Sequence, residues 1–373
     1  MLALDGLTAV ARRSARRAVP LVPRRRVSST SSPPTRSESS IYVSNSHDPW
    51  FNLAFEDWLF RKTDPDRRIL YLYRNSPSVI IGRNQNPWKE INLARLRDLE
   101  IPFVRRKSGG GTVYHDLGNT NYCVFVPRTE FDRRSNAELV TTGLNSLGVP
   151  AYVNERHDIC VDGFKMMHVS GSAFKLVNKR AYHHGTMLID AQLGNLRGVL
   201  GSKKDSMVTK GVASVPSPVR NLSETSNDVD HERFVEAVAE QFARKYGVSN
   251  EVQRIDEGEL DTNEYVRDVV DELKSWDWKY GQTPEFTHEI SGSFPFGNMT
   301  LSINSRHGLI SSASLPHPPR PLEWWRAATE LCRLLEGDRY ESVERTVEQA
   351  ATRLKGDEGD KVRRLLEWLR GEM

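Results

Sequence analysis

The order of strand-like and helical segments most constrains how this chain of 373 residues can fold. Short runs rich in β-branched and aromatic residues follow one another between residues 41 and 189, and only three helical stripes interrupt them. A doubly wound parallel sheet needs a helix after nearly every strand, so the pattern instead predicts an α+β core. The expected strands are 41–43, 69–74, 78–82, 102–106, 112–115, 121–126, 151–154, 158–161, 169–175 and 181–189, and the expected helices are 50–62, 89–99, 136–147 and 232–246.

The pattern changes near residue 258 and predicts a second, smaller domain. One helix is followed there by strand-like runs at 286–290, 299–304 and 309–313, and then by two or three charged helices. A chain of this length, with 38% apolar and 27% charged residues, can bury one large core and a smaller second one. We therefore expect a main domain at 37–250 and a small α+β accessory domain at 258–373.

Charge, cysteine content and hydropathy argue against several classes of protein. Lysine and arginine total 52 against 49 aspartate and glutamate residues, and much of the surplus lies in the first forty residues, so no nucleic-acid partner is implied. Cys123, Cys160 and Cys332 are far apart and show neither a disulfide framework nor zinc-site spacing. No apolar run approaches the roughly 18 residues that a membrane span requires. We expect a globular protein with buried free thiols and no membrane span.

Residues 1–36 have the composition of a mitochondrial presequence. Asp5 is their only acidic residue, whereas eight arginines and many serines and threonines occur there. A disordered basic tail is the alternative interpretation, but the bias ends where the first strand-like run begins, which favours targeting. We expect the protein in the mitochondrial matrix, with cleavage just after Arg26 or Val27.

Three consecutive glycines lie between two apolar strand-like runs in the segment 105–116. Because Gly109, Gly110 and Gly111 carry no side chains, their backbone N–H groups can closely approach a phosphate or a carboxylate. The segment therefore predicts an anion cradle with two arginines, Arg105 and Arg106, at its mouth. A flexible hairpin turn is the alternative. Neither the lysine of a P-loop nor a GxGxxG fingerprint is present.

Small residues and a histidine pair form a second candidate region. The run 169–175 would let a bulky ligand lie against the backbone, and the run 181–189 carries His183 and His184 at adjacent positions. Adjacent strand residues point to opposite faces, so only one of the two histidines can face a cavity. Taken alone, such a pair is more often structural than catalytic. A metal site is less favoured still, because no third ligand is evident.

Seven ordered motifs in this sequence resemble those of the lipoate-protein ligase A family. They span about 170 residues, and so many matches in the right order are very hard to obtain by chance. The motifs are WFNLAFE at 50–56, IGRNQNPWKE at 81–90, RKSGGG at 106–111, YHDLGN at 114–119, VSGSA at 169–173, HHGT at 183–186, and KGVAS at 210–214 with RNL at 220–222. A further segment, WDWKYGQTPEF at 276–286, resembles the opening of the accessory domain of bacterial-type ligases, which minimal octanoyltransferases lack.

The resemblance implies a fold, a reaction and partners. The catalytic domain of the family, here 37–250, is a mixed sheet with flanking helices similar to that of biotin protein ligases. Family members bind lipoate in an apolar tunnel, use ATP and Mg²⁺ to make lipoyl-adenylate and pyrophosphate, and then acylate a protein lysine. No tightly bound metal is expected. The acceptors would be the lipoyl domains of 2-oxoacid dehydrogenase acyltransferase subunits and the H protein of glycine cleavage.

The resemblance also implies the residues of the site. The glycines with Arg106 and Ser108 would hold the acyl-adenylate, and residues 210–222 would fold over it unless they are a simple linker. Tyr114 and the aromatic helix face at Phe51 and Phe55 would line the dithiolane tunnel, although an ordinary core is as good an account of that face. Asp158 would bind Mg²⁺ or the adenylate, or only end a strand. The expected substrate- and adenylate-binding residues are Arg83, Arg106, Ser108, Gly109, Gly110, Gly111, Tyr114, His115, Asp158, Ala173, His184 and Lys210.

The catalytic lysine of the family stands directly before the VSGSA motif, where this chain has His168. Met166, Met167 and His168 look like an insert after Lys165, which we expect to be the functional equivalent of that lysine. Three extra residues in an extended strand displace the lysine by roughly 10 Å unless they bulge out. If they cannot, either His168 supplies a weaker, pH-dependent charge at that position or activity is damaged.

Three functions fit these observations, and a complete ligase that performs both activation and transfer is the leading one. Its nearest rival is a transferase that takes preformed lipoyl- or octanoyl-adenylate, or an acyl group from another lipoyl protein, without productive use of ATP. A non-catalytic protein that binds acyl groups or adenylates is the third, because Lys165 is displaced from the family position.

Overall fold

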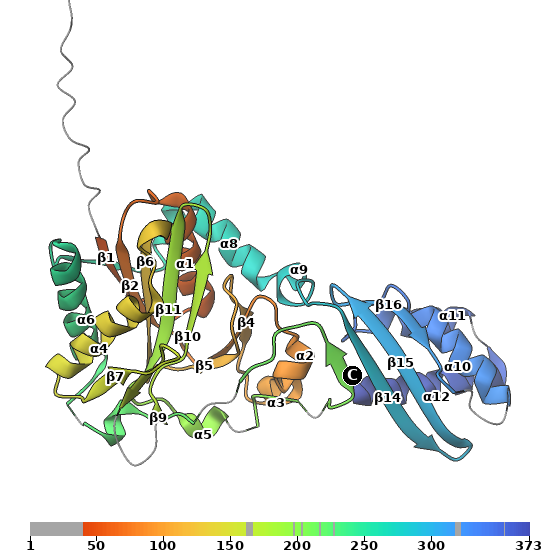
Figure 1. Ribbon diagram of the computed structural model, residues 1–373. Helices are drawn as coiled ribbons and strands as arrows, with labels where there is room; N and C mark the ends of the chain where they lie inside the picture. Colours follow the sequence, from red (N-terminus) through yellow and green to blue (C-terminus); the bar gives the residue numbers. More distant parts are fainter. Residues whose placement is uncertain are drawn as a thin grey trace, which may run out of the picture. The chain divides into compact units, whose positions relative to one another are not determined.

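A six-stranded mixed sheet organises the first part of the computed structural model, which describes residues 40–161, 167–196, 198–202, 204–215, 218–226, 228–317, 322–353 and 355–373 (Figure 1). Its strand order is β10-β11-β6-β2-β1-β13. The strand β1, next to the edge strand β13, pairs in parallel with β2 and β13, whereas β6, β11 and β10 add in antiparallel fashion. The bounds are β1 Ser40–Ser44, β2 Ile69–Arg74, β6 Asn119–Pro127, β10 Ser172–Leu176, β11 Arg180–Leu188 and β13 Val252–Ile255.

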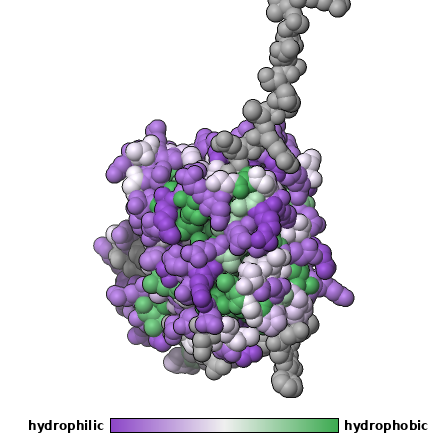
Figure 2. All heavy atoms as spheres, turned by 90° about the vertical axis from the view of Figure 1, so that its left-hand side faces the viewer, coloured by the Kyte–Doolittle hydropathy of each residue, from purple (hydrophilic) through white to green (hydrophobic). Residues whose placement is uncertain are grey.

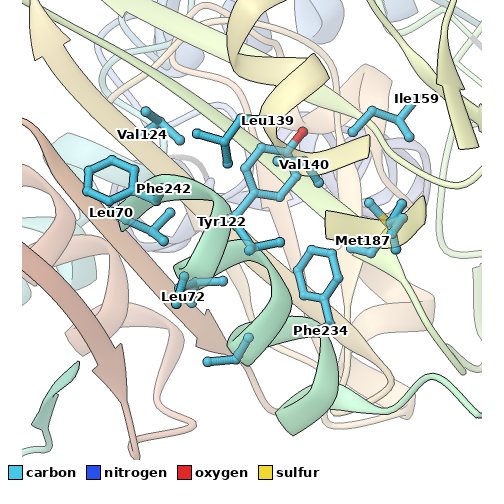
Figure 3. Packing of buried hydrophobic residues seen from close by; sticks show 14 of the residues in the cluster. Leu70, Leu72, Tyr122, Val124, Leu139, Val140, Ile159, Met187, Phe234 and Phe242 are labelled. Carbon is cyan, nitrogen blue, oxygen red and sulfur yellow. The ribbon is translucent and has the colours of Figure 1, made fainter. Parts of the chain in front are cut away.

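Helices cover both faces of this sheet because its strands are apolar on both faces. On one face, α4 (Arg133–Ser146) and α6 (His231–Tyr246) pack against alternate residues such as Leu70, Leu72 and Val124 (Figure 3). On the other face, α1 (Pro49–Lys62) and α8 (Glu264–Lys274) pack against the intervening residues, among them Tyr71 and Phe125. Because successive side chains of a strand point to opposite faces of the sheet, the interior is divided into two cores.

Two three-stranded sheets complete the first part of the chain. One has the order β4-β3-β5 and consists of β3 Ser78–Ile81, β4 Phe103–Arg105 and β5 Val113–His115. The other has the order β7-β8-β9 and consists of β7 Ala151–Val153, β8 Ile159–Val161 and β9 Met167–His168. The glycine run connects β4 to β5, but β3 lies between these two strands, pairing in parallel with β4 and antiparallel with β5. The hairpin-turn interpretation of the glycines is therefore wrong.

A four-stranded sheet with helices forms the second part, in the strand order β12-β14-β15-β16. Its core contains Leu301, Ile303, Leu331 and Leu365. The strand bounds are β12 Met207–Thr209, β14 Phe286–Phe294, β15 Gly297–Arg306 and β16 Leu309–Ser314, and the helices that follow are α10 Leu322–Leu335, α11 Glu344–Arg353 and α12 Gly356–Glu372. The sequence patterns predicted β14, β15 and β16 and two or three charged helices after them, but not β12.

The remaining elements are short and lie in the connections. They are α2 Pro87–Glu90, α3 Leu93–Asp98, α5 Leu193–Leu196, α7 Glu259–Thr262, α9 Trp276–Lys279 and the single 3₁₀ turns at Arg128–Glu130 and Leu222–Glu224. The predicted helix 89–99 is two helices, because Ile91 leaves the helical conformation and Asn92 caps α3 by accepting a hydrogen bond from Arg95 N–H. The predicted strand 169–175 begins only at Ser172.

The observed elements confirm the predicted α+β class with a mixed sheet and flanking helices. Among the described helices, none combines the length and the hydropathy that crossing a membrane requires. Figure 2 shows one face of the molecule, on which hydrophilic residues cover most of the surface and hydrophobic residues form small patches.

Candidate active site

The glycine run packs directly against the end of β3. A Cβ atom placed on Gly82 would lie closer than 3.0 Å to the carbonyl oxygen of Gly110 and 3.1 Å from its carbonyl carbon. Gly110 itself has φ +91°, a conformation that favours glycine. Arg83 N–H donates to the carbonyl of Ser108 at 2.8 Å and fixes the register of the two segments. The loop that follows β4 is thus held in one shape, which requires glycine at positions 82 and 110.

The side chain of Arg106 fills the inside of this loop. Its Nη2 donates to the carbonyls of Gly109 and Gly111 at 2.6 and 2.8 Å, and its Nη1 donates to the carbonyl of Ile80 at 3.2 Å. Within the described ranges, no hydrogen bond uses the N–H groups of Gly109, Gly110 or Gly111. Burial lowers the pKa of Arg106 to about 10, so the guanidinium stays charged at neutral pH. Three unused backbone donors and a buried cation thus belong to one short loop, which is the composition of an anion site.

A chain of polar side chains connects Arg106 to α1. Arg106 Nε donates to Ser108 Oγ at 3.0 Å, and Ser108 Oγ lies 2.9 Å from Nε2 of His184. The other ring nitrogen of His184, Nδ1, lies 3.0 and 3.1 Å from the two carboxylate oxygens of Glu56. Tyr73 Oη also donates to Glu56 at 3.2 Å. The glycine loop, β11 and α1, which are far apart in sequence, meet in this chain of buried groups.

The structure separates the two adjacent histidines as strand geometry predicts. His184 faces α1, whereas His183 pairs with Val124 in the ladder and lies edge-on to Tyr122, two residues of the core on the opposite face. Burial lowers the pKa of His183 to about 3, and neither of its ring nitrogens has a hydrogen-bond partner among the described residues. His183 is consequently a neutral core residue, and only His184 belongs to the polar chain.

One group of side chains near the glycines has the composition of a metal site. Ligand atoms of Glu56, Cys123 and His184 all lie within 4.8 Å of one another, and all three residues are buried. Hydrogen bonds between these groups already account for their arrangement, since Glu56 accepts from His184 Nδ1 and its contact with the Cys123 thiol contributes to the raised pKa of that thiol, which burial dominates. The sequence offered no third ligand for the histidine pair because Glu56 and Cys123 come from α1 and β6.

Two other expected residues, Ala173 and Tyr114, have different surroundings. Ala173 is the cross-strand neighbour of His184, and its Cβ would be 3.1 Å from a Cβ placed on Gly110. Tyr114 packs in a separate cluster with Val79 and Phe103, whereas Phe51 and Phe55 pack in the core beneath α1. The structure therefore brings Ala173 to the loop but does not bring Tyr114 to the aromatic face of α1.

His115 is buried close to the polar chain. Its Nδ1 lies 2.9 Å from the side-chain nitrogen of Asn75, and so accepts a hydrogen bond from that amide. Burial, together with the nearby Arg106 and His184, lowers the pKa of His115 to about 3. The imidazole is thus neutral at physiological pH.

The segment 210–215 reaches the glycine loop through a residue that the sequence reasoning did not select. Lys210 is exposed and its ammonium pairs with Glu285 at 2.7 Å. Ser214 Oγ instead accepts from Thr112 N–H and from Gln85 Nε2, each at 3.0 Å, and lies 3.4 Å from a Cβ placed on Gly111. The motif KGVAS contains Ser214 and the motif IGRNQNPWKE contains Gln85, so the motifs were the available signal.

Arg105 does not lie at the mouth of the loop as expected. It is fully buried, and its guanidinium donates to the carbonyl of Lys279 at 2.9 and 2.8 Å and to the carbonyls of Arg83 and Gln85 at 2.7 Å. Adjacent residues of an extended segment point to opposite sides, so only Arg106 can enter the loop. Trp278 Nε1 donates to the carbonyl of Arg105 at 2.7 Å, which further fixes the start of the WDWK segment to β4.

The remaining expected residues lie outside the chain of contacts around the glycines. Arg83 is exposed, with its guanidinium carbon 5.7 Å from the centre of the Trp278 ring. Asp158 is partly buried and pairs with Arg156 at 3.6 Å, and its backbone N–H donates to Asn154 Oδ1. Lys165 lies outside the residues that the structure describes.

Comparisons with known proteins agree with this architecture. The model of the family described as "Lipoyl protein ligase A/B catalytic domain" matches residues 48–243. Lipoate-protein ligase A of Psychrobacter cryohalolentis is 38% identical over 267 residues, which are 70% of this chain and 78% of that relative. Two solved structures are each 26% identical. LipL1 of P. falciparum in complex with lipoate has a TM-score of 0.57, and the match covers 89% of this chain and 99% of that one. Lipoate-protein ligase A bound with ATP has a TM-score of 0.54, and the match covers 65% of this chain and 98% of that one. This chain therefore belongs to the lipoyl protein ligase A/B family.

Proposed function

We propose that this protein is a lipoate-protein ligase that activates lipoate with ATP and transfers the lipoyl group to a lysine of an acceptor protein. The observation that carries the proposal is the glycine loop, whose three N–H groups are unused within the described residues and lie beside the buried guanidinium of Arg106. The relative at 38% identity is a lipoate-protein ligase A, and one structural neighbour was solved with ATP.

The chemistry of the loop suits an acyl-adenylate, which is a mixed anhydride of a carboxylic acid and a phosphate. Negative charge develops on the carbonyl oxygen when a lysine attacks and on the phosphate oxygens when AMP leaves. Fixed N–H donors and a guanidinium stabilise such charges without reorganisation, and one donor of this kind contributes about 3 to 4 kcal/mol to the transition state. The loop is therefore suited to both half-reactions.

Lys165 and Asp158 complete the proposed machinery. The ammonium of Lys165 would lie beside the acyl phosphate oxygens, as the family lysine does. Asp158 offers a partly buried carboxylate. Magnesium in nucleotide sites is typically held by one or two carboxylates together with the phosphates of the substrate. Asp158 would accordingly bind the Mg²⁺ that arrives with ATP.

The proposal extends to location, partners and domain organisation. The arginine-rich segment 1–36 supports import into the mitochondrial matrix. The acceptors there would be the lipoyl domains of 2-oxoacid dehydrogenase acyltransferase subunits and the H protein of glycine cleavage. The division into a catalytic domain at 37–250 and an accessory domain at 258–373 stays a prediction.

A complete ligase is favoured over the two rival functions. A transferase that makes no productive use of ATP and a non-catalytic binder would both retain the glycine loop. Membership of the ligase family, and the likeness to a ligase solved with ATP, favour an enzyme that performs the activation itself.

Two measurements on one sample test the proposal. The protein without residues 1–36 is incubated with lipoate, MgATP and an unmodified lipoyl domain, and pyrophosphate release is followed together with the intact mass of the acceptor. We expect pyrophosphate and the added mass of one lipoyl group, and an acceptor whose target lysine is replaced by arginine should stay unmodified. Absence of pyrophosphate from a folded enzyme would remove the ligase function.

A further inference from the structure

The polar chain that ends at Glu56 has the geometry of a nucleophile, a general base and an orienting carboxylate. Ser108 Oγ lies 2.9 Å from His184 Nε2, and His184 Nδ1 lies 3.0 Å from Glu56 Oε1. These distances fall within the roughly 2.6 to 3.2 Å that activated serine nucleophiles show. The constellation is recognised by geometry and not by position in the chain, because it occurs on unrelated folds.

We propose that Ser108, His184 and Glu56 form a nucleophilic triad that accepts an acyl group as a seryl ester and releases it to water. The protein would thereby hydrolyse activated acyl esters, including acyl-adenylates and acyl thioesters, whose chains fit the site for lipoate. The identity of the acyl chain rests on the proposed function, whereas the triad rests on the contacts described here.

The hydrogen bonds determine the tautomer of His184. The Glu56 carboxylate can only accept, so His184 Nδ1 must carry the hydrogen that faces it. In the neutral ring, the lone pair of Nε2 then faces Ser108. Glu56 is 3% exposed, and Tyr73 Oη holds it from a second direction, so the ring orientation is fixed. Glu56 would also stabilise the imidazolium that forms when His184 takes a proton.

The environment of Ser108 directs its hydroxyl hydrogen toward His184. Arg106 Nε donates to Ser108 Oγ at 3.0 Å, which uses one lone pair of the oxygen, and the hydroxyl of Tyr182 can donate to the other, so that the Ser108 hydrogen goes to the imidazole. The same guanidinium would stabilise the oxygen as it loses its proton. The N–H groups of Gly109, Gly110 and Gly111 directly follow Ser108 and make no hydrogen bond among the described residues, so they would supply the donors for the oxyanion of a tetrahedral intermediate.

The reaction balances without a further reagent. Ser108 Oγ attacks the acyl carbonyl and its proton passes to His184 Nε2, and the bond from the carbonyl carbon to the leaving oxygen or sulfur then breaks. His184 returns the proton to the leaving group. In the second step, water attacks the seryl ester with His184 as base, the bond to Oγ breaks, and Ser108 regains its hydrogen. One ester and one water give one acid and one alcohol, thiol or nucleotide.

The test uses p-nitrophenyl octanoate without ATP, followed by nitrophenolate release and by intact mass of the protein. We expect hydrolysis, an octanoyl adduct that maps to Ser108, and inhibition by lipoate. His184→Gln should lower the rate about 10² to 10⁴-fold, the usual contribution of a general base. Ser108→Ala should lower it at least as much and abolish the adduct.

A matched control and a second variant distinguish loss of the nucleophile from misfolding of the protein. Ser305 is a buried serine whose Oγ makes no hydrogen bond within the described part of the chain, so Ser305→Ala should hydrolyse like the parent. Ser108→Cys keeps a nucleophile at the same place and should carry the octanoyl group as a thioester. The inference is overturned if Ser108→Ala hydrolyses at the parental rate, or if folded Ser108→Cys takes no adduct.

The experiments distinguish a failure of the proposed triad from a failure of the proposed ligase function. A parent protein that modifies the lipoyl domain with ATP, yet neither hydrolyses the ester nor forms the adduct, refutes the triad and leaves the ligase function intact. A protein that hydrolyses the ester through Ser108 but releases no pyrophosphate from ATP and lipoate refutes the ligase function and supports the triad.

Discussion

Replacing Gly82 with alanine should damage the glycine loop from outside, without removing any group that contacts the substrate. The new Cβ would lie closer than 3.0 Å to the carbonyl oxygen of Gly110, 3.1 Å from the carbonyl carbon of Gly110 and 3.3 Å from that of Gly109. These neighbours are backbone atoms on the far side of the loop, so no side chain can rotate away. The two segments must separate by about 1 Å to restore an ordinary contact of 3.4 Å.

The expected cost follows from that displacement. Misplacing reactive groups by about 1 Å lowers the rate of an enzyme roughly 10²-fold. The hydrogen bond from Arg83 N–H to the Ser108 carbonyl, now 2.8 Å, would lengthen together with the loop. Overpacking a close contact also lowers the free energy of unfolding by about 1 to 3 kcal/mol. We therefore expect a large loss of kcat with a moderate fall of Tm.

Pyrophosphate release measured at saturating lipoate and ATP reports kcat, and thermal unfolding reports stability. Gly194→Ala is the matched control, because a Cβ on Gly194 meets nothing within 4 Å, and it should change neither quantity. If Gly82→Ala keeps the parental kcat and Tm, the loop is not held by this contact and the reasoning about its shape is wrong.

Three further predictions concern the segment over the loop, the displaced lysine and the buried histidine. Ser214→Ala removes the acceptor for Thr112 N–H, so KM for ATP should rise about tenfold with a smaller change in kcat, as initial rates at varied ATP will show. Lys165→Ala should lower the rate of lipoyl transfer about 10² to 10³-fold, and if His168→Ala does so instead, the assignment of the lysine is wrong. Burial lowers the pKa of His183 from 6.5 to about 3. Between these two pH values the unfolded chain binds a proton that the folded protein does not bind at His183, so the free energy of unfolding should fall as pH drops from about 6.5 to 3. His183→Phe should flatten that part of the stability curve in urea titrations, and an unchanged slope would contradict the assignment.

Local patterns predicted the elements well because burial determines which residues form a strand or a helix. Alternation and β-branched content located the strands of the central sheet except β13, whose residues were expected to join the two domains, and the aromatic stripe located α1. The split between α2 and α3 was also readable, since Asn86 before Pro87 and Asn92 are both helix-capping residues. The three-residue strand β12 was not predicted, because its only fully buried side chain is that of Met207 and its partner is nearly eighty residues away.

Long-range pairing limited the prediction of the site. The motifs predicted Ser108 and His184, but nothing local connects them to Glu56, which lies on another element 128 residues from His184. The position of β3 between β4 and β5 likewise depends on pairing that no local pattern encodes. The opposite directions of Arg105 and Arg106, in contrast, follow from the pleat of an extended chain and could have been predicted.

The strand β12 has a mechanical consequence for the loop that it precedes. Its last residue, Thr209, is hydrogen-bonded into the second sheet, and five residues later Ser214 contacts the glycine loop. Five residues can span at most about 17 Å when fully extended, so this short tether sets an upper limit on how far β14 can travel while Ser214 stays in place. Larger excursions of the second sheet must break the contacts of Ser214 with Gln85 and Thr112, so movement of that sheet and release of this segment from the glycine loop are coupled.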